Sequence, residues 1–397
     1  MEVKPDYKST EVGVIPVDWE LKSIAQIGTV GRGRVISHKE ISRARTSQYP
    51  VYSSQTSDDG VMGYLDTFEF EGDYITWTTD GANAGTVFAR DGRFNCTNVC
   101  GTIKLASDNH RFVAKVLGRI APHHVSRHLG NPKLMNDVVK RISIPLPPTR
   151  AEQDAIATVL SDVDELLEGL QRLIGKKRYL KQAAMYQLLT AQTRLPGFEG
   201  EWEVKPLGAL GTFLKGSGVT KDQARSGSLA CIRYGELYTL HADVVRGFQS
   251  WISSEVAATA VRLRQGDILF AGSGETKEEI GKCAAFVSDV EAYAGGDIVI
   301  LRPNGSDSRF LGYYLNTGSI AKQKANRGQG DAVVHISSSA LADIRCKLPS
   351  LPEQTAVADV LTEMDAELAM LEQRREKTRA IKQGMMQQLL TGQVRLV

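Results

Sequence analysis

The sequence predicts an α+β protein in which two mixed α/β globes are joined by two long helices, packed as an antiparallel coiled coil. Three observations lead to this prediction. A segment in the middle of the chain recurs near its end, both copies carry apolar residues every three or four positions, and short β-branched and aromatic runs fill the stretches between them. The repeat predicts a pseudo-twofold arrangement, and 397 residues leave room for two or three domains.

The composition narrows the class of protein. Hydrophobic residues make up 42% and charged residues 24%, which is typical of globular proteins. No run approaches 18 apolar residues, so no transmembrane helix is expected, and the residues from Met1 to Thr10 lack the apolar core of a secretory signal. The five cysteines form no CxxC pair, so we expect neither a disulfide framework nor a zinc site. Free cysteines are typical of a reducing compartment, so we expect a cytoplasmic location. The formal net charge is only +2, so any nucleic-acid site must come from local basic loops.

The first globe is expected over residues 1–148 and the second over residues 193–349. Strands are predicted at β-branched and aromatic runs such as residues 74–79, and short helices at segments such as residues 111–120. The two globes are weakly related in sequence, as two pairs of matching segments indicate. These are Trp19-Glu20 with Trp202-Glu203, and Gly72-Asp73 with Gly266-Asp267.

The two long helices are expected over residues 149–192 and 350–397, and they are copies of one another. Glu152-Gln153 recurs as Glu353-Gln354 and Gln187-Leu188-Leu189-Thr190 recurs as Gln388-Leu389-Leu390-Thr391, with no gap in between. Thr149-x-x-Glu152 and Ser350-x-x-Glu353 predict a capping box at each start. Each helix would be roughly 60 Å long at 1.5 Å per residue, which favours a helix pair over two ordinary core helices.

An apolar stripe with a period of about 3.5 residues predicts the faces on which the two helices pack. We expect the equivalent positions of the two copies to contact each other. The stripe residues are Ile156, Leu160, Val163, Leu167, Leu170, Val357, Leu361, Met364, Leu368 and Leu371.

Three segments resemble the specificity (S) subunit of type I restriction-modification enzymes. They are Thr10–Trp19 (TEVGVIPVDW), Ile144–Gln153 (IPLPPTRAEQ) and Lys382–Gly392 (KQGMMQQLLTG), and the likeness covers essentially the whole chain. Residues 348–354 (LPSLPEQ) depart slightly from the usual Pro-Pro form of that family. The resemblance implies that the globes are target recognition domains, each reading half of a split site in double-stranded DNA. It also implies that the helices set the spacing and dock two methyltransferase subunits.

The same resemblance implies the further partners and cofactors. Restriction and translocase subunits would join through the methyltransferase complex, and no membrane partner is expected. No cofactor is expected in this chain, because S-adenosylmethionine would belong to the methyltransferase partner, and ATP and Mg would belong to the restriction partner. No metal is expected either: His123, His124 and His128 have no acidic or cysteine neighbour in sequence.

Basic and small polar residues in the globes are the candidate DNA contacts. Glycines beside arginines let backbone approach phosphate, Asn83 could read an adenine edge, and Tyr234 could stack. A solvated basic loop and a tight β-turn remain alternatives for the segments around residues 32–45 and 78–85. The candidates are Arg32, Arg34, Lys39, Arg43, Arg45, Thr79, Asn83, Arg127, His128, Asn131, Lys215, Ser217, Arg233, Tyr234, Ser273, Lys277, Arg327 and Gln329.

Catalytic motifs are not found in the sequence. There is no Walker motif, HExxH zinc motif or nucleophile elbow, and Asn131-Pro132-Lys133 lacks the second proline and the aromatic residue of an amino-methyltransferase box. We therefore expect a non-catalytic DNA-recognition subunit. A self-contained nuclease or methyltransferase, and a coiled-coil scaffold without a DNA role, are the alternatives.

Overall fold

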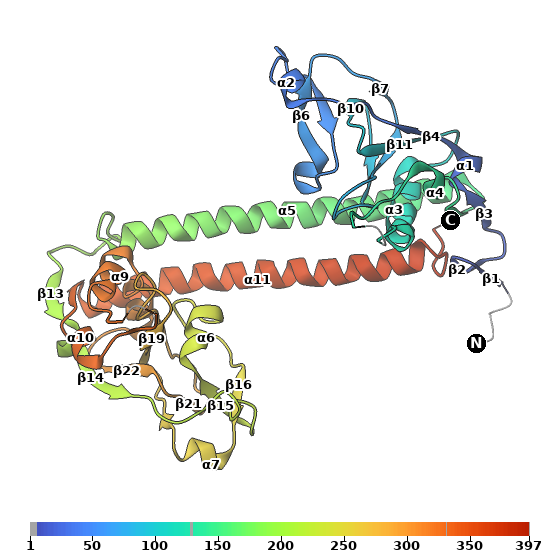
Figure 1. Cartoon of the computed structure of the whole chain (residues 1–397). Helices are drawn as coiled ribbons and strands as arrows, with labels where there is room; N and C mark the ends of the chain where they lie inside the picture. Colours follow the sequence, from blue (N-terminus) through green and yellow to red (C-terminus); the bar gives the residue numbers. More distant parts are fainter. Residues whose placement is uncertain (1–5, 128–129, 331, 397) are drawn as a thin grey trace. The chain divides into compact units, whose positions relative to one another are not determined.

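The computed structural model describes residues 6–127, 130–330 and 332–396 (Figure 1). The chain divides into two compact units, of which the first comprises Met1–Gln171 with Gln373–Val397 and the second Arg172–Glu372. Each unit therefore contains one globe, one half of the first long helix and one half of the second. None of the described helices is long and apolar enough to cross a membrane.

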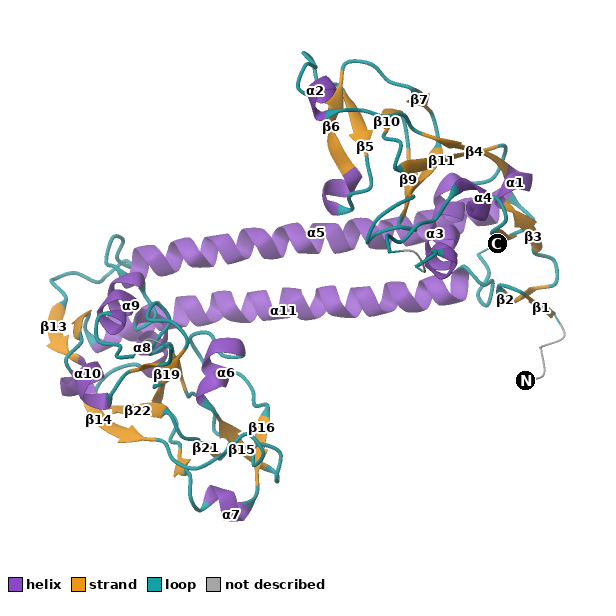
Figure 2. Cartoon of the chain, viewed as in Figure 1, coloured by secondary structure: helices purple, strands orange, loops and turns teal. Residues whose placement is uncertain are grey.

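The first globe is built from short strands and helices around the start of the first long helix (Figure 2). Its strands are β1 (Tyr7–Thr10), β2 (Gly13–Pro16), β3 (Glu20–Ser23), β4 (Gly28–Arg32), β5 (Tyr49–Tyr52), β6 (Val61–Leu65), β7 (Phe70–Glu71), β8 (Tyr74–Thr78), β9 (Val87–Arg90), β10 (Arg93–Cys96), β11 (Cys100–Leu105) and β12 (Ser143–Leu146). Its helices are α1 (Ile24–Ile27), α2 (His38–Ile41), η1 (Ser57–Gly60), α3 (His110–Ile120), η2 (Ala121–His124) and α4 (Asn136–Val139).

The second globe has the same kinds of element. Its strands are β13 (Glu203–Pro206), β14 (Gly211–Lys215), β15 (Leu229–Ile232), β16 (Ser250–Ile252), β17 (Val261–Arg262), β18 (Ile268–Ala271), β19 (Ser273–Gly274), β20 (Cys283–Ala285), β21 (Ala292–Ala294), β22 (Ile298–Pro303), β23 (Val334–His335) and β24 (Arg345–Leu348). Its helices are η3 (Leu207–Leu210), α6 (Tyr234–Thr239), α7 (Ser254–Ala257), α8 (Ser308–Tyr314), α9 (Gly318–Ala325) and α10 (Ser338–Ala342).

The strand order of the sheets is the same in the two globes, although their sequences have diverged. One four-stranded sheet runs β4-β11-β8-β9 in the first unit and β14-β22-β18-β20 in the second, entirely antiparallel in both. A second sheet runs β6-β5-β10-β7 and β16-β15-β21-β17, with one parallel pair at its centre in each unit. The weak sequence relation between the globes therefore corresponds to a shared architecture.

The expected helices over residues 149–192 and 350–397 are α5 (Arg150–Leu189) and α11 (Leu351–Leu389). In the first unit Asp164 pairs with Lys382, and Gln171 accepts a hydrogen bond of 2.8 Å from Arg375. Residue numbers therefore rise along one helix as they fall along the other, so the two halves run antiparallel. The second unit repeats this direction, because Lys177 pairs with Glu367 and Lys181 with Asp365 at 2.6 Å each.

The expectation that equivalent positions of the two copies contact each other is wrong. Ile156 and Leu160 belong to a buried cluster that contains Leu389 and Leu390, from the end of the second copy. In the other unit, Val357 and Leu361 belong to a cluster that contains Leu188 and Leu189. An antiparallel direction brings the start of each helix against the end of the other, which a shared register along the sequence does not reveal.

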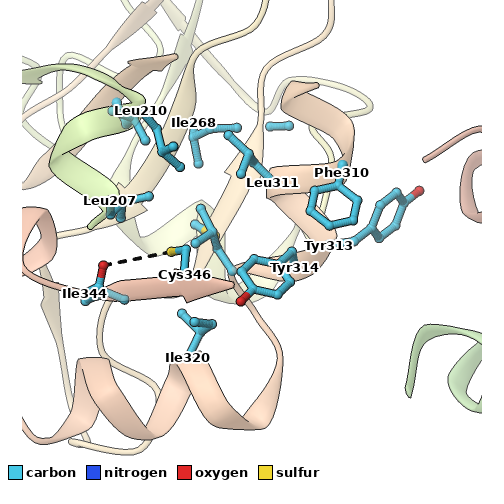
Figure 3. Close-up of a cluster of buried hydrophobic side chains, with 14 of the residues drawn as sticks. Leu207, Leu210, Ile268, Phe310, Leu311, Tyr313, Tyr314, Ile320, Ile344 and Cys346 are labelled. Carbon is cyan, nitrogen blue, oxygen red and sulfur yellow. Dashed lines mark hydrogen bonds between the residues drawn. The ribbon is translucent and has the colours of Figure 1, made fainter. Parts of the chain in front are cut away.

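The stripe residues differ in burial along each helix. Ile156, Leu160, Val357 and Leu361 are fully buried beside the globes, whereas Val163, Leu167, Met364 and Leu371 are only half-buried. The core of the second unit contains residues of both the long helix and the globe. Val357 and Leu361 of α11 belong to the same buried cluster as the globe residues. Among these, Phe310, Leu311 and Tyr314 of α8 lie close to Ile344 and Cys346, at and just before β24 (Figure 3). Each long helix therefore serves as one wall of a globe's core at its first turns.

The predicted capping boxes form only in part. The backbone N–H of Glu152 donates to Thr149 Oγ1 at 3.2 Å, as expected. The Glu152 carboxylate, however, binds the guanidinium of Arg395, and the carboxylate of Glu353 binds Arg194 in the same way. Both glutamates are 2% exposed, and a buried carboxylate gains more from a bidentate guanidinium than from one backbone amide.

Candidate nucleic-acid interface

Three segments of the first unit meet to form a polar surface. Residues 79–85 follow β8, Ser126 and Lys133 form an antiparallel β-bridge, and Arg32 ends β4. The segments are joined by main-chain hydrogen bonds, from Gly81 N–H to Pro132 O at 3.0 Å and from Leu134 N–H to Thr79 O at 2.9 Å. We call this surface the first polar ladder, after the isolated β-bridges that link Asp80 and Ser126 to Lys133.

Arg32, Asp80 and Lys133 form the charged part of the first polar ladder. Arg32 Nη2 lies 3.4 Å from Asp80 Oδ2, and Lys133 Nζ lies 3.7 Å from Asp80 Oδ1. Two cations thus share one carboxylate, which leaves a net positive charge that can attract phosphate. Thr79 was expected to contact DNA but is fully buried, and its hydroxyl contacts Arg32 Nη2 at 3.2 Å and Asp80 at 2.7 Å. It therefore orients the two charged side chains instead of facing solvent.

Asn83, Arg127 and Asn131 are exposed at the tips of the same ladder. The amide of Asn83 donates to Thr56 Oγ1 at 3.2 Å, which fixes its orientation. The turn itself is tight, because Gly81 and Gly85 both have positive φ angles. The loop can therefore be both a tight β-turn and a DNA contact, because the turn presents the exposed amide of Asn83. His128 lies outside the described residues.

Arg34 lies close to Arg32 in sequence but has a different environment. Its guanidinium hydrogen-bonds the carboxylate of Glu40, with Nη1 to Oε2 at 2.9 Å, and that of Glu69. These contacts, led by the hydrogen bond to Glu40, raise the pKa of Arg34. Its charge is balanced by two carboxylates within the first unit, so it is poorly placed to neutralise a phosphate.

Lys39, Arg43 and Arg45 lie on and after α2, and their side chains are exposed. None of these three side chains makes a hydrogen bond or an ion pair with the described residues. The segment after α2 is held by Asp66, whose carboxylate accepts N–H bonds from Arg45 and Thr46, both at 2.8 Å. The hydrogen bond from the Arg45 amide contributes most to lowering the pKa of Asp66. The loop is therefore ordered by its main chain while its cations remain available for phosphates.

Replacing Lys39, Arg43 and Arg45 together by alanine is expected to weaken binding to every DNA sequence. If all three neutralise phosphates, the slope of log K against log salt should flatten by about 2.7, at about 0.9 per contact. Binding isotherms at several salt concentrations, on cognate and scrambled duplexes, measure it. The control is Lys22→Ala with Arg93→Ala, because those cations pair with Glu20 and Glu71. An unchanged slope would exclude this loop from the interface.

The second unit contains an equivalent construction, which we call the second polar ladder. β19 follows β18 and pairs with β23, and His335 of β23 pairs in turn with Gln329. Ser273 Oγ lies 2.8 Å from His335 Nδ1, and the Tyr238 hydroxyl donates to Ser273 O at 3.1 Å. Ser273 is 3% exposed, so the expectation that it contacts DNA is wrong for its side chain. His335 and Gln329 are the exposed members of this ladder.

The other candidates of the second unit fall into two groups. Lys215, Tyr234 and Lys277 have exposed side chains that make no hydrogen bond or ion pair with the described residues. Those used within the unit are Ser217, which donates to Thr259 O at 2.6 Å, Arg233, which lies 3.5 Å from Glu236, and Arg327, which donates to Gln323 O and Asp343 O. The structure brings the segments of Lys215 and Arg233 together through the neighbouring residues Gly295 and Gly296. The Gly296 N–H donates to Gly218 O, near Lys215, and the Gly295 N–H donates to Ile232 O, beside Arg233.

Sequence reasoning missed Asp80, Lys133 and His335, which lie at the centres of the two ladders. They are brought to their partners by β-bridges between segments that are distant in the chain. The only local signal was the Asn131-Pro132-Lys133 turn beside the expected basic residues. The alternating pattern of two-residue bridges is too short to be recognised in a sequence.

A family model for the type I restriction modification DNA specificity domain matches residues 16–175 and 199–379. The MjaVIII specificity subunit of Methanocaldococcus jannaschii is 24% identical over 96% of this chain and 94% of that protein. The MpnII specificity subunit of Mycoplasma pneumoniae is 34% identical over 43% of this chain and 52% of that protein. Another type I specificity subunit of that bacterium is 38% identical over 41% of this chain, and the match spans 44% of its length.

Among solved structures, a type I S subunit from M. genitalium has the same fold, with a TM-score of 0.67 at 16% identity over 98% of both chains. The two matches of the family model fall one on each globe with the helix that follows it, and together they cover most of the chain. This chain therefore belongs to the family of type I restriction-modification specificity subunits and carries two copies of its DNA specificity domain.

Proposed function

We propose that this chain is the non-catalytic DNA-recognition subunit of a type I restriction-modification enzyme, and that each unit reads one half of a bipartite, asymmetric DNA site. The observation that carries this proposal is the pair of polar ladders. They occupy equivalent places in two globes with the same strand order, but one presents Arg32, Asp80 and Lys133 and the other His335 and Gln329. Different donors and acceptors at equivalent places would read different bases.

The long helices would set the distance between the two half-sites and dock two methyltransferase subunits. Half-sites on one face of DNA must be about one helical turn apart, or a multiple of it, and a helix pair fixes such a distance better than a flexible linker. Large apolar side chains are exposed on both helices, among them Tyr179 at 72%, Tyr186 at 59% and Met370 at 65%. Exposed aromatic residues and methionines of this kind are enriched at protein interfaces.

The cofactors of the reaction would then reside in the partners. S-adenosylmethionine would bind the methyltransferase subunits, and ATP with Mg would bind the restriction subunits that join through them. The assembly would act in the cytoplasm on double-stranded DNA. A self-contained nuclease or methyltransferase is the alternative; binding of S-adenosylmethionine by the isolated chain would favour it.

Exchanging residues 20–147 for the same block of a relative is expected to change one half-site only. Each globe has its own core and its own polar ladder, so its base contacts should move with it. Mapping methylated positions in DNA modified by the chimera with its methyltransferase partner measures the outcome. The matched control exchanges residues 204–347, which should change the other half-site. A chimera in which both half-sites change would contradict the separate reading by the two units.

A coiled-coil scaffold without a DNA role is the other alternative, and alanine variants of the first polar ladder test it. Alanine substitutions at Arg32 and Lys133 should abolish preference for the cognate duplex while the chain remains folded and bound to its methyltransferase partner. Retention of sequence-specific binding by this variant would exclude the first polar ladder as the reading surface.

A further inference from the structure

Three side chains with metal-binding atoms meet at the start of α3 in the first unit. His110 is the first residue of α3, Asp73 lies in the turn before β8, and Asp91 lies in the turn between β9 and β10. One ligand atom from each residue lies within 4.8 Å of the others. None of the three belongs to the first polar ladder, so the proposed reading of DNA does not use them.

The backbone of the two turns places the carboxylates together. Gly72 and Gly92 have φ angles of 98° and 80°, which glycine adopts without strain. The Gly72 N–H donates to Gly92 O at 2.9 Å and so joins one turn to the other. Asn109 caps α3 by accepting a hydrogen bond of 2.9 Å from Phe112 N–H, which fixes the position of His110. All three groups therefore come from ordered main chain.

The imidazole of His110 is buried and faces the two carboxylates. Its side chain is 8% exposed, and its buried Nε2 makes no hydrogen bond with any residue that the structure describes. Nε2 lies 2.8 Å from Asp91 Oδ1, and Nδ1 lies 3.5 Å from Asp73 Oδ2. A buried ring nitrogen without a hydrogen bond is costly, and both carboxylates remain partly exposed to incoming solutes.

The turn of the second unit that is equivalent to the Asp73 turn holds an ion pair. Asp267 occupies the turn equivalent to that of Asp73, after Gly266 with a φ angle of 97°. Its carboxylate is fully buried and binds Arg302 through two hydrogen bonds of 2.8 Å. Ser308 begins α8 where His110 begins α3. In the first unit Asp73 faces His110 and lies beside Asp91, whereas Asp267 in the second unit binds an arginine of β22.

We propose that Asp73, Asp91 and His110 bind a divalent first-row transition ion, for which Zn²⁺ is the best fit. One imidazole nitrogen and two carboxylate oxygens match the ligands of Zn²⁺, whereas Mg²⁺ and Ca²⁺ prefer oxygen alone. Arg111 Nη2 holds Asp91 Oδ2 at 2.8 Å and leaves Oδ1 toward His110. Three protein ligands leave room for water in the fourth position. The ion would fasten both turns to the start of α3.

Calorimetric titration of the full chain with ZnCl₂ tests this site, and MgCl₂ is titrated separately as the comparison. We expect one Zn²⁺ per chain and no matching Mg²⁺ site. Asp73→Asn, Asp91→Asn and His110→Ala should each weaken Zn²⁺ binding by at least about tenfold. The asparagine variants are nearly isosteric at partly exposed positions, so they keep the test valid if His110→Ala fails to fold.

His123→Ala is the matched control, because His123 is an exposed histidine of the same globe. It should leave the affinity unchanged. Absence of Zn²⁺ binding by the unaltered chain would overturn the proposal, and so would equal loss in His123→Ala, which would indicate adventitious binding to surface histidines. X-ray absorption of the Zn²⁺-loaded chain should show one nitrogen and two carboxylate oxygens at about 2.0–2.2 Å. None of these readouts involves DNA, so failure here leaves the proposed function standing.

Discussion

Replacing Arg395 by methionine is expected to lower the free energy of unfolding by about 3–5 kcal/mol, because it leaves the buried carboxylate of Glu152 without a cation. Arg395 Nη2 lies 2.7 Å from Glu152 Oε2, and the Arg395 guanidinium lies 5.9 Å from the Trp19 ring centre. The Glu152 side chain is 1% exposed, so water cannot replace the lost partner. Methionine keeps much of the apolar stem, which isolates the loss of charge from the loss of packing.

The second unit supplies an independent repetition of this experiment. Arg194 binds Glu353 at 2.6 Å and lies over Trp202 at the same 5.9 Å, so Arg194→Met should have a similar cost. Urea denaturation followed by tryptophan fluorescence measures both, since each pair lies against a tryptophan. The control is Arg379→Met, whose partner Glu376 is exposed, and it should cost less than about 1 kcal/mol. A loss in Arg395→Met no larger than in this control would contradict the assigned role of the pair.

The long helices are the part of the fold that the sequence predicts best. Their period predicts both helices, because helix formation depends on residues three and four positions apart. Each helix begins one residue after its expected start, but α5 ends three residues and α11 eight residues before the expected end. The side chains of Glu152 and Glu353 were assigned to capping boxes for the same local reason. Their true partners, Arg395 and Arg194, each follow the end of the other long helix and are therefore distant in the sequence. No local pattern contains that choice.

The candidate interface was predicted in part: exposed Arg32, Asn83 and Asn131 were included, but the exposed Lys133 and His335 were missed, and the buried Thr79 and Ser273 were wrongly included. Arg32, Asn83 and Asn131 converge on one ladder, as basic and small polar loops would. Thr79 and Ser273 are also small polar residues but are buried: Thr79 directly follows β8, and Ser273 begins β19, two residues after the end of β18. Burial of a hydroxyl depends on which segment crosses over it, and that is a long-range property of the sheet.

Ile156→Ala and Leu390→Ala are each expected to lower the free energy of unfolding by about 2–5 kcal/mol, the usual cost of truncating a fully buried aliphatic side chain. Both residues are at most 1% exposed and belong to the same cluster of the first unit. The double variant should cost less or more than the sum by about 0.5–3 kcal/mol, because residues that share a cluster leave one common cavity. Denaturation of the four chains of this cycle measures the coupling energy.

The same measurement with Val357→Ala in place of Leu390→Ala decides the direction of the helices. Val357 is the copy of Ile156 in the repeat, but it is buried with Leu188 and Leu189 in the second unit. The pair Ile156 and Val357 should therefore be additive within about 0.5 kcal/mol. Leu167→Ala, at a half-buried position of the stripe, should cost less than Ile156→Ala. Strong coupling between Ile156 and Val357, with additivity between Ile156 and Leu390, would instead require the two helix copies to run parallel and in register.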